Sequence, residues 1–155
     1  MSSTPSTDDH TARADASVAA VPHKAMRRVL LVEDDPIIAL MLEEALLRGG
    51  AGEVVVCATM QATLHELEKP ERPDALILDV HLADRDDGWA LAELVTLLGP
   101  KPPRIVFSTG SPEDIPAAVA GMGPVFEKPY DPDELVKALI GDARPGFFAR
   151  LRGAL

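Results

Sequence analysis

The sequence is short of the residues on which several common classes of protein depend. Its single cysteine, Cys57, excludes an internal disulfide and a zinc knuckle built on several thiolates. No apolar run approaches the roughly 18 residues of a membrane span, and the N-terminal region lacks the apolar stretch of a secretion signal. Positive charge is also scarce, because 15 Lys and Arg stand against 25 Asp and Glu, a net charge of −10. Such a surface disfavours binding to nucleic acid and anionic membranes, so we expect a soluble, cytoplasmic protein.

The composition divides the 155 residues into three parts, enough for one domain with tails. Residues 1–26 are rich in Ser, Thr, Asp and Ala and have little large apolar surface to bury, which predicts a disordered arm. Residues 27–141 contain regular apolar runs and form the predicted domain. Residues 142–155 are a short extension with apolar residues at every fourth position, which fits a partner-binding amphipathic helix, a frayed tail or a flap on the domain itself.

Short apolar runs alternate with segments of helical spacing along the predicted domain. The predicted strands are residues 28–32, 54–57, 75–78, 104–108 and 124–127, and the predicted helices are residues 36–48, 60–69, 88–98, 112–121 and 132–140. The fourth helix is expected to be short or irregular, because Pro116 lies inside it and glycines follow. Five such alternations predict an α/β fold, a parallel sheet with helices on both faces.

Polar residues stand where the predicted strands end. They are Glu33, Asp34 and Asp35 after the first strand, Asp79 after the third, Ser108 and Thr109 at the fourth, and Lys128 after the fifth. Ligands of an open parallel sheet bind beyond the carboxyl ends of its strands, so we expect these groups to converge. Clustered carboxylates repel one another unless a proton or a cation neutralises them, and Mg²⁺ suits such oxygens. Together with the ammonium and hydroxyl groups, they suit a phosphoryl group carried on Asp79.

Four segments of the sequence resemble the receiver domain of two-component response regulators. They are VLLVEDDP at residues 29–36, ALILDVHL at 75–82, FSTG at 107–110 and FEKPY at 126–130. The resemblance covers residues 27–140, and the four segments occur in the family's order. It implies a flavodoxin-like (CheY-like) fold, that is, a doubly wound five-stranded parallel sheet, which agrees with the alternation of strands and helices.

The resemblance also implies catalytic roles for three side chains. Asp79 matches the phospho-acceptor, Thr109 matches the switch hydroxyl, and Lys128 matches the lysine that pairs with the phosphate. Pro129 matches a proline that is preceded by a cis peptide bond in this family. We therefore expect Lys128 to be aimed into the site.

A magnesium site is implied at the same positions. Asp34 matches a direct Mg²⁺ ligand, Glu33 a residue that acts mainly through metal-bound water, and Asp79 a further ligand. The backbone carbonyl of His81 matches the remaining protein ligand. Asp35, the next acidic residue, is interpreted as a helix N-cap or a rim charge.

The function implied by the resemblance is that of a single-domain response regulator. It accepts a phosphoryl group on Asp79 from a histidine kinase or a histidine phosphotransfer protein, in a Mg²⁺-dependent reaction. It then relays the signal to an unknown downstream protein or passes the phosphoryl group on. It is a signalling phospho-acceptor rather than an enzyme, because it catalyses only its own phosphorylation and dephosphorylation. Neither a nucleic acid partner nor membrane insertion is expected.

Three features depart from the family's pattern. Val125 stands where most receivers have Tyr or Phe, and Phe126 is expected to point to the other side of its strand. Only 128 − 109 = 19 positions separate Thr109 from Lys128, fewer than usual, and the shortage falls on the fourth helix. Residues 107–111, FSTGS, are similar to the signature of the FAT GUY single-domain receivers, with serine at the tyrosine position.

Two other functions remain as alternatives. A receiver-like module that binds proteins without phosphorylation is suggested by Val125 and the short fourth helix. A phosphatase of the haloacid-dehalogenase type also uses an aspartate after a parallel strand, but it needs a second aspartate two positions on, where this chain has His81. The retention of all the phosphorylation residues favours the response regulator.

Overall fold

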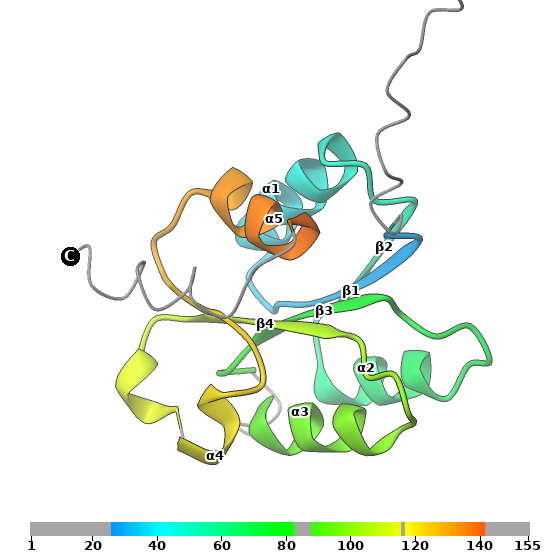
Figure 1. Cartoon of the computed structure of the whole chain (residues 1–155). Coiled ribbons are helices and arrows are strands. Elements are labelled where there is room, and N and C mark those ends of the chain that lie inside the picture. The colour runs from blue at the N-terminus through cyan, green and yellow to red at the C-terminus, as the bar shows by residue number, and fades with distance from the viewer. Residues whose placement is uncertain (1–25, 83–87, 116, 142–155) are drawn as a thin grey trace, which may run out of the picture.

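The computed structural model describes residues 26–82, 88–115 and 117–141, and its centre is a parallel sheet of five strands (Figure 1). The strands are β1 (Arg28–Val32), β2 (Glu53–Cys57), β3 (Ala75–Asp79), β4 (Arg104–Thr109) and β5 (Val125–Glu127). Their order across the sheet is β2-β1-β3-β4-β5, and every neighbouring pair is parallel. The predicted α/β class and parallel sheet are therefore confirmed.

Helices cover both faces of the sheet, as the doubly wound fold requires. They are α1 (Pro36–Arg48), α2 (Met60–Leu67), α3 (Gly88–Leu97), α4 (Ala117–Ala120) and α5 (Pro132–Ile140). Figure 1 shows α1 and α5 side by side on one face, with α2 and α3 on the other. The fourth helix is only 4 residues long and is preceded by a 3₁₀ turn, η1 (Pro112–Asp114), which confirms that it is short. None of the helices in the described ranges is long and apolar enough to span a bilayer.

The apolar strand sequences follow from burial on both faces. Every residue of β1 and β3 is buried, so neither strand has a solvent face that needs polar side chains. Alternate residues enter two separate cores: Leu31 and Ile77 pack beneath α1 and α5, whereas Leu30 and Leu76 pack beneath α2 and α3. These two central strands thereby fix the positions of the polar residues that follow them.

The start of α1 is fixed directly after the acidic end of β1. The Asp35 carboxylate accepts hydrogen bonds from the N–H groups of Ile37 at 2.9 Å and Ile38 at 3.2 Å, and Pro36 occupies the first turn. The interpretation of Asp35 as an N-cap is confirmed. Its side chain is committed to the helix, which leaves Glu33 and Asp34 as the acidic residues at the end of β1.

The described residues begin with Met26, the last residue of the predicted arm. Its side chain is buried in the core beneath α1 and α5, and its carbonyl accepts a 2.8 Å hydrogen bond from the N–H of Gly52, so the packed domain includes it. The rest of the predicted arm and the extension at 142–155 lie outside the described residues.

The glycine before β5 permits a close approach of two backbones. A Cβ atom on Gly123 would overlap the carbonyl oxygen of Ile105 in β4, whereas a Cβ on Gly121 would meet nothing within 4 Å. We expect Gly123→Ala to lower the free energy of unfolding by about 1–3 kcal/mol, because the backbone has to move. Gly121→Ala, the matched control, should stay within about 0.5 kcal/mol of the wild type. Urea denaturation of both variants checks this, and equal effects would contradict the close approach.

Candidate active site at the carboxyl ends of the strands

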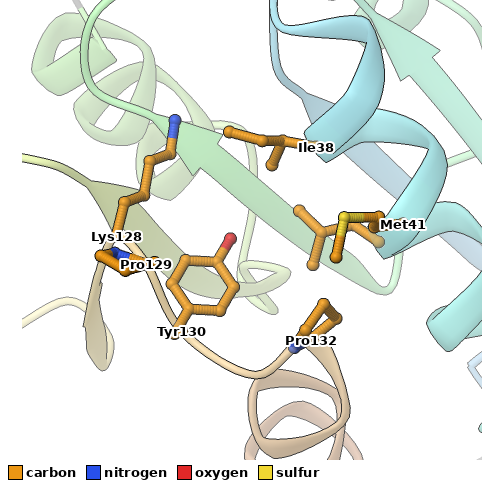
Figure 2. A pocket seen from close by; sticks show the side chains of 7 residues that line it. Ile38, Met41, Lys128, Pro129, Tyr130 and Pro132 are labelled. Atoms are coloured by element: carbon orange, nitrogen blue, oxygen red, sulfur yellow. The ribbon is translucent and has the colours of Figure 1, made fainter.

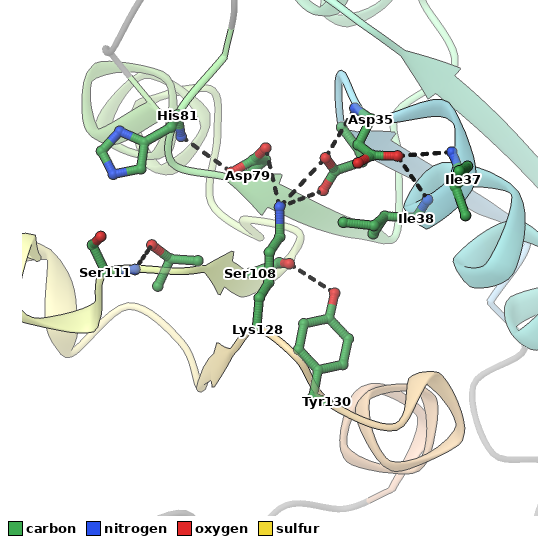
Figure 3. Close-up of polar contacts among 11 residues, drawn as sticks. Asp35, Ile37, Ile38, Asp79, His81, Ser108, Ser111, Lys128 and Tyr130 are labelled. Atoms are coloured by element: carbon green, nitrogen blue, oxygen red, sulfur yellow. Dashed lines mark hydrogen bonds and ion pairs between the residues drawn. The ribbon is translucent and has the colours of Figure 1, made fainter.

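The side chains predicted from the sequence lie at the carboxyl edge of the sheet, where Lys128 and Asp79 face each other (Figure 3). Strand order reverses around β1 and β3, so the ends of these neighbouring strands form the point where open α/β sheets bind ligands. Glu33 and Asp34 follow β1, Asp79 ends β3, Thr109 ends β4, and Lys128 follows β5. The structure thus brings together residues that are up to 95 positions apart in the sequence.

Three carboxylates form an acidic cluster at this edge. Glu33, Asp34 and Asp79 each offer an oxygen, and these atoms all lie within 4.8 Å of one another. Glu33 and Asp79 are only 2% and 4% exposed, whereas Asp34 is half-buried. Two of the three charges are thereby removed from most of the water that would otherwise screen their repulsion.

The ammonium group of Lys128 lies between the two buried carboxylates. Its Nζ atom is 3.1 Å from Oε2 of Glu33 and 3.3 Å from Oδ2 of Asp79. The backbone N–H of Lys128 donates a 2.7 Å hydrogen bond to the carbonyl of Thr109, and the Lys128–Pro129 peptide bond is cis, as the resemblance implied. The two ion-pair distances show that the Lys128 side chain points into the site.

Burial and the charges of this site together shift the pKa of two groups in it. Burial, together with the nearby charge of Asp79, raises the pKa of Glu33 from 4.5 to about 7, and the hydrogen bonds from Asp35 and Lys128 offset only part of this effect. Burial opposes the charge of Lys128, but Asp79 and Glu33 outweigh it and hold the pKa of the ammonium above its usual value. The Lys128 ammonium therefore stays charged, and the three nearby carboxyl groups leave the site with a surplus of negative charge.

The acidic cluster fits a hard divalent cation. The Oε2 atom of Glu33 is buried and, among the described residues, has no hydrogen-bond partner, although it is in ion-pair contact with Lys128. The cluster offers only oxygen donors, and half-buried Asp34 leaves one side open to water. Oxygen ligands with room for retained waters are what Mg²⁺ prefers.

His81 contacts Asp79 through its backbone, and Thr109 ends the neighbouring strand β4. The backbone N–H of His81 donates a 3.1 Å hydrogen bond to Oδ1 of Asp79, so the peptide chain at His81 passes beside the carboxylate, while its side chain is exposed. The hydroxyl oxygen of the fully buried Thr109 accepts a 3.0 Å hydrogen bond from the N–H of Ser111. The loop at 83–87 lies outside the described residues.

The two consecutive side chains of β5 point to opposite faces, as expected. Val125 packs against the core beneath α2 and α3, and Phe126 packs against the core beneath α1 and α5. No aromatic ring of β5 therefore lies on the Val125 side.

One neighbour of the site was not predicted as functional. The Tyr130 hydroxyl is 2.7 Å from the hydroxyl of Ser108 (Figure 3). The Tyr130 ring also meets Phe126 edge-on, with 5.7 Å between the ring centroids. The sequence signals were a polar residue at the end of a buried strand and an aromatic residue two positions after Lys128. Neither signal indicates that Ser108 and Tyr130 contact each other.

An apolar pocket of about 320 Å³ lies beside the site, between α1 and the loop that connects β5 to α5 (Figure 2). Its lining residues are Ile38, Met41, Leu42, Lys128, Pro129, Tyr130 and Pro132. The sequence did not indicate this pocket, because its two walls come from segments that are far apart in the chain.

Comparison with known proteins agrees with this geometry. The family model of the response regulator receiver domain matches residues 29–140. A receiver domain (CheY-like) from Methylobacillus flagellatus is similar at 25% identity and a TM-score of 0.62, over 71% of this chain and 92% of that chain. A receiver domain protein from Bacillus halodurans is similar at 24% identity and a TM-score of 0.60, over 72% of this chain and 94% of that chain.

A third solved structure shares the fold. It is a response regulator protein from Burkholderia pseudomallei, determined with a phosphorylated aspartic acid, a calcium ion and citrate. It is 22% identical with a TM-score of 0.63, over 83% of this chain and 73% of that chain. No curated protein matches the chain. The solved structures confirm the predicted flavodoxin-like fold.

Because the pKa of Glu33 is raised, replacing its carboxylate with a neutral amide should stabilise the folded protein, and this gain should depend on pH. The folded-state pKa of about 7 lies above the ordinary 4.5, so ionised Glu33 destabilises the folded state above neutral pH, and this penalty disappears as the pH falls toward 4.5. In EDTA, Glu33→Gln should raise the free energy of unfolding at pH 8 by up to about 3 kcal/mol. The gain should shrink steadily on acidification toward pH 5.

Denaturation at the two pH values measures this difference. Glu44→Gln makes the same chemical change at an exposed position of α1 and should leave stability within about 0.5 kcal/mol of the wild type at both. A Glu33→Gln protein that is less stable than the wild type at pH 8 would show that the ion pair with Lys128 outweighs the repulsion.

Proposed function

The chain belongs to the family of response regulator receiver domains, and from this membership we propose that it accepts a phosphoryl group on Asp79 from a phosphohistidine. Receiver domains are signalling modules of two-component systems. The observation that carries the assignment to Asp79 is its place at the end of β3, 4% exposed and paired through one oxygen with Lys128. The donor is a histidine kinase or a histidine phosphotransfer protein.

The contacts of Asp79 suit it to act as a nucleophile. Its Oδ1 atom accepts the hydrogen bond from the His81 N–H, and its Oδ2 atom faces the Lys128 ammonium, so the carboxylate is held in one orientation. In the transfer, an Asp79 oxygen forms a bond to phosphorus while the P–N bond breaks and its electron pair returns to the imidazole nitrogen. A proton on the other ring nitrogen lets the donor leave as a neutral imidazole.

Magnesium is the cofactor that the acidic cluster would hold. Glu33, Asp34 and Asp79, with the backbone carbonyl of His81, are the proposed ligands. Bound there, Mg²⁺ offsets the negative charge of the carboxylates and of the phosphoryl oxygens. Lys128 supplies a second positive charge from the end of β5, and its ion pair with Asp79 can be exchanged for one with a phosphoryl oxygen.

Thr109 is proposed to respond to the new phosphoryl group. Its hydroxyl oxygen accepts from Ser111, so its own proton is available for donation to a phosphoryl oxygen after rotation of the side chain. Hydrolysis later reverses the state: water attacks phosphorus, the Asp79–phosphorus bond breaks, and inorganic phosphate leaves. The signal passes to a downstream protein or by phosphotransfer, and the protein acts as a response regulator.

The alternative function is a receiver-like module that binds proteins without phosphorylation. It is supported by Val125 at the position of the usual aromatic residue and by the 4-residue α4. The ion pairs of Lys128 with Asp79 and Glu33 favour the phospho-acceptor, because a module without this chemistry has no need to bury two carboxylates.

The proposed function predicts covalent labelling that depends on one carboxylate. With acetyl phosphate and Mg²⁺, the wild-type protein should gain the mass of one phosphoryl group, because the Asp79 oxygen displaces acetate. Asp79→Asn should show no gain, since an amide is not a nucleophile at this pH. Asp35→Asn is the matched control, because asparagine is also a good N-cap and the residue lies outside the cluster, so labelling should persist.

Intact-protein mass spectrometry with and without EDTA checks these outcomes. Labelling of Asp79→Asn would contradict the assignment of the acceptor, and labelling in EDTA would contradict the role of Mg²⁺. A wild-type protein that neither gains mass nor binds beryllofluoride would favour the phosphorylation-independent module.

A further inference from the structure

A hydrogen bond that the phosphoryl-transfer chemistry does not use connects the site to the apolar pocket. Ser108, the next-to-last residue of β4, is 1% exposed, and its hydroxyl is 2.7 Å from that of Tyr130. Tyr130 in turn forms one wall of the pocket (Figure 2). One contact thus joins a strand end of the active site to a surface cavity.

The loop that carries Lys128 is attached to the end of β4 at two points. The backbone N–H of Lys128 donates to the carbonyl of Thr109 at 2.7 Å, and the Tyr130 hydroxyl bonds to Ser108. Ser108 and Thr109 are consecutive, and so are Lys128, Pro129 and Tyr130. Two consecutive residues of the strand therefore hold both ends of a three-residue segment.

The surroundings of Tyr130 make its hydroxyl a lasting partner for Ser108. The ring packs edge-on against Phe126, and burial raises the pKa of the phenol, so that the hydroxyl keeps its proton. On the opposite face of the sheet, the β5 residue paired with Phe107 is Val125, which has no polar side-chain atom for a similar contact. The polar connection from β4 to the loop therefore runs toward α1 and α5.

We propose that Tyr130, acting through Ser108, is a positioning residue for Lys128, and that this pair couples occupancy of the Asp79 site to the apolar pocket. The inference rests on the proposed function. When Lys128 and Thr109 engage a phosphoryl group, the end of β4 and the loop move together because they are attached at two points. The Tyr130 ring moves with them, and the wall of the pocket changes.

The cost of losing the contact is bounded by the strength of one hydrogen bond. Without it, Lys128 occupies its place only part of the time, and the apparent affinity for a phosphoryl mimic falls by that fraction. A net hydrogen bond corresponds to a factor of between about twofold and tenfold.

The test is the affinity of the full chain for beryllofluoride in the presence of Mg²⁺, measured by calorimetry. Tyr130→Phe keeps the ring and removes the hydroxyl, and Ser108→Ala removes its partner. Each should weaken binding by between about twofold and tenfold. The affinity of the double variant should be no lower than that of the single variant with the lower affinity, because both changes remove the same contact.

A matched control separates positioning from a general loss of stability. Thr63 is fully buried in α2, on the other face of the sheet, and its hydroxyl donates a 2.8 Å hydrogen bond to the carbonyl of Thr59. Thr63→Val removes a hydrogen-bonded hydroxyl as Tyr130→Phe does, but it should leave the affinity unchanged even where the melting temperature falls.

A second readout follows the pocket itself. Tyr130 is the only tyrosine in the sequence, so the tyrosine ring signals in an NMR spectrum belong to it alone. In the wild type these signals should shift when beryllofluoride and Mg²⁺ are added, and in Asp79→Asn they should not.

Three results would overturn the inference and leave the proposed function standing. They are wild-type affinity in Tyr130→Phe and Ser108→Ala, unchanged tyrosine signals in a wild-type protein that binds beryllofluoride, and equal weakening by Thr63→Val. A wild-type protein that binds no beryllofluoride would overturn the proposed function, and this inference with it.

Discussion

The ion pairs of Lys128 with two buried carboxylates are the interaction on which the rest of this site depends. Glu33 and Asp79 are almost completely removed from water, and Asp34 adds a third carboxyl group nearby. Burial and the nearby charge of Asp79 raise the pKa of Glu33 to about 7, and the single ammonium group of Lys128 offsets only part of this effect. The surplus of negative charge is a cost to stability that a divalent cation would remove, and the same surplus makes the cluster a site for such a cation.

The fold makes this concentration of charge possible by fixing the backbone. Both central strands are fully buried, so their ends cannot shift to relieve the repulsion without opening a packed core. Asp35 is withdrawn from the cluster because its carboxylate caps α1. Lys128 arrives from another strand end, held by its backbone hydrogen bond to Thr109. A rigid sheet thus presents carboxylates that would separate in a flexible chain.

The loop after β5 gives the site a connection to one particular face of the molecule. Because Val125 and Phe126 point to opposite faces, the polar contact between Ser108 and Tyr130 lies on the side of α1 and α5, beside the apolar pocket. The short α4 lies beside α3, on the other face of the sheet (Figure 1). The proposed coupling from Asp79 to the pocket runs through the ion pair with Lys128 and along the loop to Tyr130, which is hydrogen-bonded to Ser108.

The sequence by itself determined the class of fold and the chemistry of the strand ends. Fully buried strands need unbroken apolar runs, helices need caps such as Asp35, and polar residues directly after buried strands have to lie at the edge of the sheet. Only the tertiary structure decided that Lys128 lies between Glu33 and Asp79 and that the pKa of Glu33 is raised. It also decided that the Tyr130 hydroxyl contacts Ser108 beside the apolar pocket. These features depend on the path of a loop and on the distances between side chains far apart in the chain. Local spacing and periodicity carry no information about either.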